Sequence, residues 1–264
     1  MSPRVKPVTF FGIGNISQKE ISNQQLHSSP QDKNKNTARM SSSRKVVELF
    51  YDVTSPYSWL AFEVLCRYRN VWNINLKFKP AFLGGVIYGS GNHPPALNPS
   101  KLLYMVSDLT LLSEYFGVPI FQKSYLPEKG SLNAMRFVTA VSEREKQGDM
   151  LERVSRELWK RKWRSHKDIT QPTSLTEAGI EAGLPSNEVK EILTLSASQP
   201  IKDKLKSVTQ EALEYKCCFG LPFIVCHVNG KSEVFFGSDR FEVMAYFIGE
   251  KWMGPYPYNP IAQK

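Results

Sequence analysis

The chain has 264 residues, of which 41% are hydrophobic and 12% aromatic, enough to bury a complete core. Its formal net charge is +9, but residues 1–44 hold seven basic and two acidic side chains, so the rest has an excess of only four positive charges. This modest excess suits a small anionic ligand and argues against nucleic acid as a partner. No apolar run approaches the ~18 residues that a membrane span requires, so no membrane span is expected.

Residues 1–44 lack hydrophobic periodicity and are rich in Ser, Asn, Gln and Lys. This composition predicts a disordered N-terminal extension. Its basic, Ser-rich character is compatible with an organellar transit peptide, although Glu20 and Asp32 weaken that interpretation. Met40 could equally be an internal start that makes the upstream part optional. Both interpretations stay open.

The stretch from residue 45 to residue 59 organises the rest of the chain. Nearly every residue in 46–53 is β-branched, aromatic or aliphatic, which is typical of a strand buried on both faces. Apolar residues at helical spacing begin at Trp59, directly after Ser55 and Pro56. Because Ser is favoured at a helix N-cap and Pro at the first helical position, the stretch predicts a central strand that leads straight into a helix capped by Ser55.

The next segments predict a second strand and a long helical region. Residues 73–79 alternate polar and apolar side chains, as a half-exposed strand does. Residues 84–99 are rich in Gly and Pro, which indicates a long loop of the kind that is usually functional or disordered. From residue 100 to residue 198, apolar side chains recur at helical spacing, and residues 174–177 form a capping box at the start of one helix.

The C-terminal segments predict a helix, a β-hairpin and a last helix. Residues 201–212 show helical spacing, and Asn229-Gly230 is a strong two-residue hairpin turn between two apolar strands. Ser238 and Asp239 are expected to cap a helix over residues 240–249.

The order of these elements predicts an α/β fold, a thioredoxin-like core with an inserted all-helical domain. Residues 45–83 form the first part of the core and residues 199–264 the second part. Residues 84–198 form the loop and the inserted helical domain.

Three turns of such a core lie along one edge of the sheet. They are residues 55–58 at the first helix, residues 220–222 before the third strand, and residues 237–239 before the last helix. A thioredoxin fold would place a cis-proline at Pro222, which would expose the backbone of Leu221 to an extended peptide. Taken alone, the motif is equally compatible with an ordinary trans-proline at a strand edge. The three turns could therefore bind the thiol, the backbone and a terminal carboxylate of one small peptide.

The start of the first helix favours negative charge, including a thiolate, because unpaired backbone N–H groups and the helix dipole point there. Thioredoxin-like proteins carry Cys-x-x-Cys at this position. Here Ser55 and Ser58 have hydroxyl groups instead, so the site cannot cycle between dithiol and disulfide. If chemistry occurs there, the sulfur must come from a ligand; otherwise Ser55 only caps a helix.

The chain resembles the kappa-class glutathione transferases over about residues 46–260. The resemblance rests on five runs, which are Phe50-Tyr51-Asp52-Val53, Ser55-Pro56-Tyr57-Ser58-Trp59, Phe219-Gly220-Leu221-Pro222, Phe236-Gly237-Ser238-Asp239-Arg240 and Gly249-Glu250-Lys251-Trp252-Met253-Gly254-Pro255. It implies a DsbA-like thioredoxin fold and a homodimer that conjugates glutathione, its co-substrate, to small electrophiles. Reduction of organic hydroperoxides is a further implied activity.

The resemblance also implies how glutathione is bound near its sulfur. Ser55 hydrogen-bonds the sulfur, and Pro56 and Tyr57 complete that loop. Leu221, which precedes Pro222, pairs through its backbone with the cysteinyl unit.

The two ends of glutathione are assigned by the same resemblance. Ser238 and Asp239 hold the γ-glutamyl end, and Asn92 and Lys101 reach the glycyl end. A glutathione-dependent isomerase of the hydroxychromene-carboxylate type is an alternative function, because such enzymes share the serine site. A non-catalytic thioredoxin-fold scaffold or chaperone is a second alternative, but it has no need of all these residues together with Ser55.

The four cysteines, Cys66, Cys217, Cys218 and Cys226, show no metal-ligand spacing, so no metal is expected, and the adjacent pair is poorly placed for an ordinary disulfide. We expect Cys217 and Cys218 to be buried or partly buried spectators, although they could form mixed disulfides near the ligand. Residues 159–167 interleave aromatic and basic side chains, and we interpret them as a solvated helix face anchored to the core by Trp.

Localisation follows from the family and from the C-terminus. The kappa class is associated with mitochondria and peroxisomes. The last residues, Ile261-Ala262-Gln263-Lys264, depart from the peroxisomal type of address. Mitochondria are therefore the expected compartment, with a peroxisomal or cytoplasmic location as alternatives.

Overall fold

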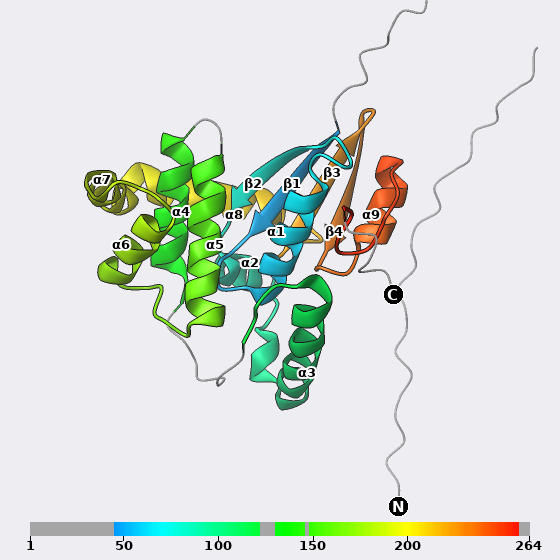
Figure 1. The fold of residues 1–264 in the computed structure, drawn as a ribbon, viewed down its shortest axis with the longest axis horizontal. Coiled ribbons are helices and arrows are strands. Elements are labelled where there is room, and N and C mark those ends of the chain that lie inside the picture. The colour runs from blue at the N-terminus through cyan, green and yellow to red at the C-terminus, as the bar shows by residue number, and fades with distance from the viewer. Residues whose placement is uncertain (1–44, 122–129, 146–147, 259–264) are drawn as a thin grey trace, which may run out of the picture. The chain divides into compact units, whose positions relative to one another are not determined.

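A four-stranded mixed sheet is the centre of the computed structural model, which describes residues 45–121, 130–145 and 148–258 (Figure 1). The described residues belong to one compact unit, Ser42–Lys264. The expectations for residues 1–44 and for the C-terminal address lie outside the described residues. Across the described part of the chain, no helix combines the length and the hydropathy of a membrane span.

The strand order in the sheet is β2-β1-β3-β4. β1 pairs in parallel with β2 and antiparallel with β3, and β3 pairs antiparallel with β4. The central strand predicted from the sequence is therefore β1, with neighbours on both sides. The strands are β1 (Val46–Tyr51), β2 (Asn75–Pro80), β3 (Phe223–Val228) and β4 (Lys231–Phe236).

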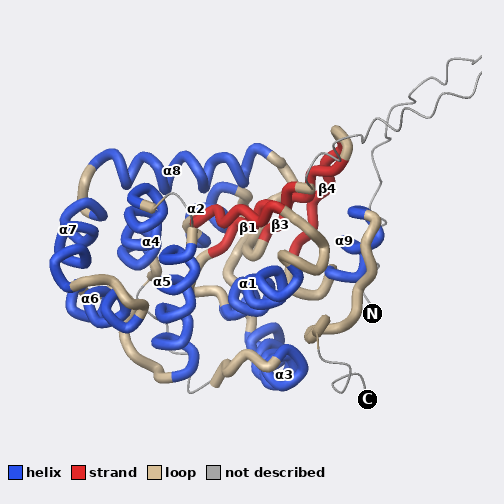
Figure 2. The backbone as a smooth tube through the Cα atoms, turned by 45° about the horizontal axis from the view of Figure 1, so that its top comes forward, coloured by secondary structure: helices blue, strands red, loops and turns tan. Residues whose placement is uncertain are grey.

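Helices cover both faces of this sheet. Leu49 and Tyr51 point into a cluster with α1, whereas Phe50 points into a second cluster with α2 and α8. Figure 2 shows the sheet between α8 and α1. The helices are α1 (Pro56–Tyr68), α2 (Leu83–Gly89), α3 (Pro99–Phe116), α4 (Leu132–Arg144), α5 (Asp149–Trp159), α6 (Pro172–Glu181), α7 (Ser186–Ser196), α8 (Gln199–Glu214) and α9 (Phe241–Ile248), with a 3-10 turn η1 (Pro95–Leu97) and a π-helical turn η2 (Lys160–Arg164).

Helices α3 to α7 lie between β2 and α8 in the sequence, where the inserted helical domain is predicted. Buried side chains of α4 and α5, such as Val138 and Leu158, belong to the same core cluster as Leu49 of the sheet. Burial against this shared core, rather than intrinsic propensity alone, stabilises these helices. Trp159, at the end of α5, belongs to this shared core and lies next to the beginning of α1.

The structure corrects three local predictions. The Gly- and Pro-rich stretch 84–99 is not one long loop, because α2 and η1 lie within it. Helix α6 begins at Pro172, with Gln171 as its N-cap residue, so the expected capping box at residues 174–177 does not start it. Pro at the first helical position explains the earlier start.

The third correction concerns residues 159–167. Trp159 is buried, as predicted for the aromatic anchor, but Arg161 and Lys162 are also buried in the π-helical turn. Arg161 is paired with Glu177, and its Nε donates to Asp168 O at 3.1 Å. The predicted solvated face is therefore wrong for these two cations. For Arg161, the ion pair and the backbone acceptor compensate for the burial of the guanidinium group.

Candidate functional site

Ser55 begins helix α1 as predicted. Ser55 is the N-cap residue, with φ −86° and ψ 118°, and Pro56 is the first helical residue. The backbone N–H of Ser58 donates to Ser55 Oγ at 3.1 Å. The Ser55 side chain is only 4% exposed. The predicted cap is therefore confirmed, and it fixes the hydroxyl oxygen at the N-terminal end of the helix.

The same hydroxyl group contacts the segment before β3. Ser55 Oγ donates to Leu221 O at 3.1 Å, across 166 residues of sequence. The Leu221–Pro222 peptide bond is cis, as the thioredoxin-like pattern predicts. The structure therefore brings the first and second predicted turns into direct contact.

The third turn is attached to the second. Gly237 N donates to Pro222 O at 3.1 Å, and Gly237 has φ +94°. A Cβ at this position would lie 2.8 Å from Asp239 Oδ1. Because Asp239 is exposed and its side chain can move, the left-handed backbone is the feature that favours glycine here.

The structure corrects the expected cap of the last helix. Helix α9 begins at Phe241 with Arg240 as its N-cap residue, and no side chain caps it. Ser238 and Asp239 therefore precede the helix instead of capping it. Ser238 is buried, whereas Asp239 is exposed and lies 3.6 Å from Arg240 Nη1. An exposed pair of this kind contributes little to stability, so the Asp239 carboxylate is available to a ligand.

Asn92 connects the Gly- and Pro-rich stretch to the segment before β3. Its Nδ2 donates to Phe219 O at 2.7 Å, and its Oδ1 accepts from His93 N at 2.8 Å. The Asn92 amide group has two N–H donors and two oxygen lone pairs. These two bonds use one donor and one lone pair, so one of each is left for a ligand. The segment Phe219–Pro222 is thus bonded to Asn92, Ser55 and Gly237.

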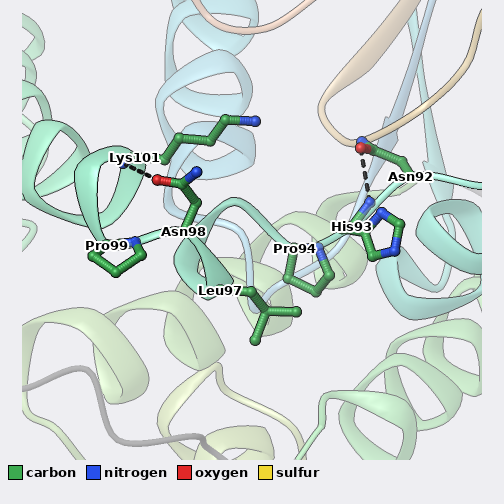
Figure 3. Close-up of a pocket in the computed structure, with 7 residues that line it drawn as sticks. All are labelled: Asn92, His93, Pro94, Leu97, Asn98, Pro99 and Lys101. Carbon is green, nitrogen blue, oxygen red and sulfur yellow. Dashed lines mark hydrogen bonds between the residues drawn. The ribbon is translucent and has the colours of Figure 1, made fainter. Parts of the chain in front are cut away.

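Asn92 and Lys101 line the same pocket, which has a volume of about 410 Å³. Figure 3 shows these two residues at opposite ends of the lining, with Lys101 in the first turn of α3. The pocket does not include Ser55 or Leu221 among its lining residues. It is linked to the Ser55–Leu221 contact through Asn92, whose Nδ2 donates to Phe219 O, two residues before Leu221. The lining residues are Asn92, His93, Pro94, Leu97, Asn98, Pro99 and Lys101.

Tyr57 is held by a residue that the sequence interpretation missed. Tyr57 OH donates to Asp108 Oδ2 at 2.8 Å, and Tyr104 OH lies 3.5 Å from Asp108 Oδ1. The first bond connects α1 with α3. Asp108 follows Lys101 by two helical turns, so the spacing indicates that both lie on the same face of α3. The spacing does not show that Asp108 bonds to Tyr57 of α1.

Two more residues near Ser55 were not assigned a role from the sequence. Trp159 Nε1 donates to Ser55 O at 3.1 Å, and the Trp159 ring is stacked with Trp59 at an interplanar angle of 3°. Asp52 is completely buried, and its backbone O accepts from Ser55 N at 3.0 Å. Asp52 stands in one of the five runs quoted above, which was the only available signal for it.

The cysteines are all free in the structure. Cys217 is exposed, contrary to the expectation of burial, whereas Cys218 is buried and burial raises the pKa of its thiol to about 11. Cys66 is half-buried, and its Sγ donates to Glu152 Oε1 at 3.1 Å. Among the described residues, no group of three or more metal-ligating side chains is suited to a metal ion.

Known proteins match this chain at the level of the fold. The profile of the DSBA-like thioredoxin domain matches residues 46–249. A solved 2-hydroxychromene-2-carboxylate isomerase is similar, with a TM-score of 0.62 and 19% sequence identity over 77% of this chain and 94% of that one. A DsbM disulfide reductase from Pseudomonas aeruginosa, solved with GSH, is similar with a TM-score of 0.51 and 13% identity over 72% of this chain and 89% of that one. The chain belongs to the DSBA-like thioredoxin domain proteins, which confirms the predicted fold class.

Relatives with similar sequences indicate to which group of DSBA-like proteins the chain belongs. The chain is 50% identical to human glutathione S-transferase kappa 1 over 217 residues, which are 81% of this chain and 95% of the relative. It is 48% identical to the Rattus norvegicus protein of the same name, over 83% of this chain and 97% of the relative. Within the DSBA-like proteins, the chain therefore belongs to the kappa glutathione S-transferases, as the sequence resemblance indicated.

Proposed function

We propose that this protein transfers glutathione to small electrophiles, with the hydroxyl group of Ser55 as the donor that stabilises the glutathione thiolate. The observation that carries the proposal is the contact between Ser55 Oγ and Leu221 O at 3.1 Å, at the N-terminal end of α1. Membership of the kappa class, with 50% identity to the human enzyme, supports the same activity.

Binding of the tripeptide would replace the hydrogen bond between Ser55 and Leu221 by bonds to the ligand. The Ser55 hydroxyl group would turn from Leu221 O to the glutathione sulfur, and Leu221 O would then accept from the backbone N–H of the cysteinyl unit. Each group loses one hydrogen bond and gains one, so neither is left unsatisfied. Pro56 and Tyr57 would form the wall of the loop around the sulfur, with Tyr57 held in place by Asp108.

The thiolate needs this support because a free thiol has a pKa of about 8.5 and is only a few per cent ionised at neutral pH. A charge-assisted hydrogen bond stabilises the charged form by about 1.5–3 kcal/mol, or about one to two pKa units. The positive end of the α1 dipole acts in the same direction. Together these effects would make most of the bound thiol ionised, and the thiolate is the nucleophile.

The ends of the tripeptide would lie on opposite sides of the Ser55–Leu221 contact. Asp239 would pair with the γ-glutamyl ammonium group and Ser238 with its carboxylate. Lys101 and the second N–H of Asn92 would bind the glycyl carboxylate, in the pocket that both residues line. The modest positive charge of residues 45–264 agrees with an anionic ligand.

We also propose that the protein reduces organic hydroperoxides. The same thiolate would attack a peroxide oxygen and break the O–O bond, which gives the alcohol and a glutathione sulfenic acid. A second glutathione would then reduce the sulfenic acid, forming glutathione disulfide and water. The isomerase alternative is disfavoured, because the 19% identity to the isomerase reflects only the shared fold, whereas 50% identity favours transfer. The scaffold alternative does not account for the 50% identity to a glutathione S-transferase over 95% of that relative's length. Mitochondrial localisation stays a proposal that rests on the family and on the C-terminal residues.

A homodimer is proposed from the exposed face of α3. Leu103, Tyr104, Leu111 and Tyr115 are each exposed by about half or more. Exposed apolar side chains that gather on one helix face commonly mark an interface. We expect light scattering to give the mass of two chains, and Leu111→Asp to give the mass of one; a wild-type mass of one chain would contradict this.

Ser55→Ala tests the catalytic proposal. We expect the pKa of enzyme-bound glutathione to rise by about one to two units, with a corresponding fall in the conjugation rate at neutral pH and a comparatively unchanged affinity. Ultraviolet difference titration of the bound thiolate measures the pKa, and turnover of an activated chloronitrobenzene measures the rate. Ser165→Ala, at an exposed serine after η2, is the matched control. An unchanged titration curve for Ser55→Ala would remove Ser55 from the mechanism.

A further inference from the structure

We propose that Asp52 is a positioning residue of the glutathione site. Its buried carboxylate holds Ser55 and the segment before Pro222 in their relative positions. The inference rests on the proposed role of Ser55, because it concerns the placement of that hydroxyl group. Asp52 itself touches neither Ser55 Oγ nor Leu221 O among the hydrogen bonds of the described residues.

The first route from Asp52 to the site is the turn that leads into α1. Asp52 Oδ1 accepts from Thr54 N at 2.8 Å, and Asp52 O accepts from Ser55 N at 3.0 Å. A side chain that accepts from a backbone N–H two residues ahead stabilises a turn. These two bonds fix the backbone of Thr54 and Ser55, and therefore the origin of the Ser55 side chain.

The second oxygen of Asp52 is bonded to two other elements. Asp52 Oδ2 accepts from Leu83 N, the first residue of α2, at 2.8 Å, and from Ser131 Oγ, at the N-cap of α4, at 2.7 Å. The N-cap residue of α2, Phe82, has no polar side chain, so Asp52 supplies the acceptor that this helix start needs. One carboxylate thus connects the starts of α1, α2 and α4.

Helix α2 carries this connection to the other side of the site. The backbone N–H of Asn92 donates to Ile87 O in the last turns of α2, at 3.0 Å. Asn92 Nδ2 in turn donates to Phe219 O at 2.7 Å. Asp52 therefore reaches both partners of the Ser55–Leu221 contact, one through the turn and one through α2.

A carboxylate is required here rather than any polar group. Both Asp52 oxygens face backbone N–H groups, and an amide nitrogen cannot accept a hydrogen bond. Burial raises the pKa of Asp52, but the three donors and the positive charge of the buried Lys162 oppose that rise. Asn has the same size but only one acceptor oxygen, so Asp52→Asn must leave either Thr54 N or Leu83 N facing another donor.

The experiment compares three variants of the full chain. Asp52→Asn removes one acceptor. Leu83→Pro removes the backbone donor on α2 together with the leucine side chain. Pro is tolerated at this first helical position, because the preceding Phe82 is extended, with φ −90° and ψ 109°. Leu83→Ala keeps the N–H and truncates the side chain, and is the matched control. For each, thermal unfolding, ultraviolet titration of bound glutathione, and kcat and KM are measured well below the unfolding temperature.

We expect Asp52→Asn to raise the pKa of the bound thiol and to lower kcat about tenfold to a hundredfold, because small displacements of reacting groups have effects of that size. Leu83→Pro should move both quantities in the same direction by less, and Leu83→Ala should leave the thiol pKa at the wild-type value. If Asp52→Asn does not fold, the pair Leu83→Pro and Leu83→Ala decides.

A purely structural role has a different signature. In that case Asp52→Asn or Leu83→Pro lowers the unfolding temperature but leaves the thiol pKa and kcat of the folded protein unchanged, which overturns the inference. If the wild-type protein itself shows no titration of bound glutathione, the proposed function fails instead, so the two failures are distinguishable.

Discussion

The starts of α1 and α9 are both assigned to the proposed glutathione site, but they are built differently. The start of α1 is buried and bonded on all sides, by Ser58 N, Leu221 O and Trp159 Nε1. The start of α9 has no side-chain cap, and Asp239 before it is exposed. A nucleophile requires exact placement, whereas a charged ligand end requires an accessible counter-charge. We therefore expect changes at α1 to affect kcat and stability, and changes near α9 to affect KM.

The largest effect in this comparison is expected from Trp159→Ala. Trp159 is fully buried against Trp59, and removal of such a ring costs about 3–5 kcal/mol of unfolding free energy. It also removes the N–H that donates to Ser55 O, so the turnover of whatever remains folded should fall. Urea denaturation measures the stability.

Trp159→Phe separates the ring from the hydrogen bond, because it keeps most of the ring and removes only the indole N–H. It should cost clearly less stability than Trp159→Ala and still reduce kcat. Equal turnover in Trp159→Phe and wild type would show that the bond to Ser55 O does not position the site.

Asp239→Asn should have an intermediate effect, confined to binding. We expect KM for glutathione to rise about tenfold through loss of a charge-assisted hydrogen bond in a partly solvated position. The unfolding free energy should change by less than about 0.5 kcal/mol, because the pair with Arg240 is exposed. Steady-state kinetics with glutathione as the varied substrate measures this. Glu233→Gln, at an exposed carboxylate on β4, is the control; a fall in kcat instead of a rise in KM would contradict the division between the two helix starts.

The smallest effect is expected from Lys101→Gln. Lys101 is exposed, so its attraction for the glycyl carboxylate is largely screened, and KM should rise only about threefold. The difference from wild type should shrink further between about 0.05 M and about 0.5 M NaCl. Lys190→Gln, at an exposed lysine on α7, controls for the loss of net charge. A difference that does not depend on salt would mean that Lys101 acts by a contact other than ion pairing.

Local patterns in the sequence predicted those helix starts that depend only on residues adjacent in the chain. The start of α1 was readable because capping by Ser55 and the place of Pro56 depend on one turn of backbone. The start of α9 was misplaced, because Ser238 and Asp239 are also good capping residues and the sequence does not show that Gly237, at φ +94°, turns the chain before Arg240. The prediction of a loop at residues 84–99 was wrong because the sequence does not show how its glycines pack. The glycines of α2 lie close to Phe82, Thr209 and Leu213, and this packing compensates for their low helix propensity.

The sequence by itself determined the Ser55 cap, because capping depends on residues that are adjacent in the chain. It also indicated the α/β class, through the order of the elements, and the kappa class, through five short runs spread along the chain. Only the tertiary structure showed which distant residues Trp159, Asn92 and Asp52 bond to. Their partners are residues such as Ser55, Phe219 and Ser131, which lie between 79 and 127 positions away. Hydrophobic periodicity specifies which face of a helix or strand is buried, but the pairing of polar groups across the core is set only when those faces pack together.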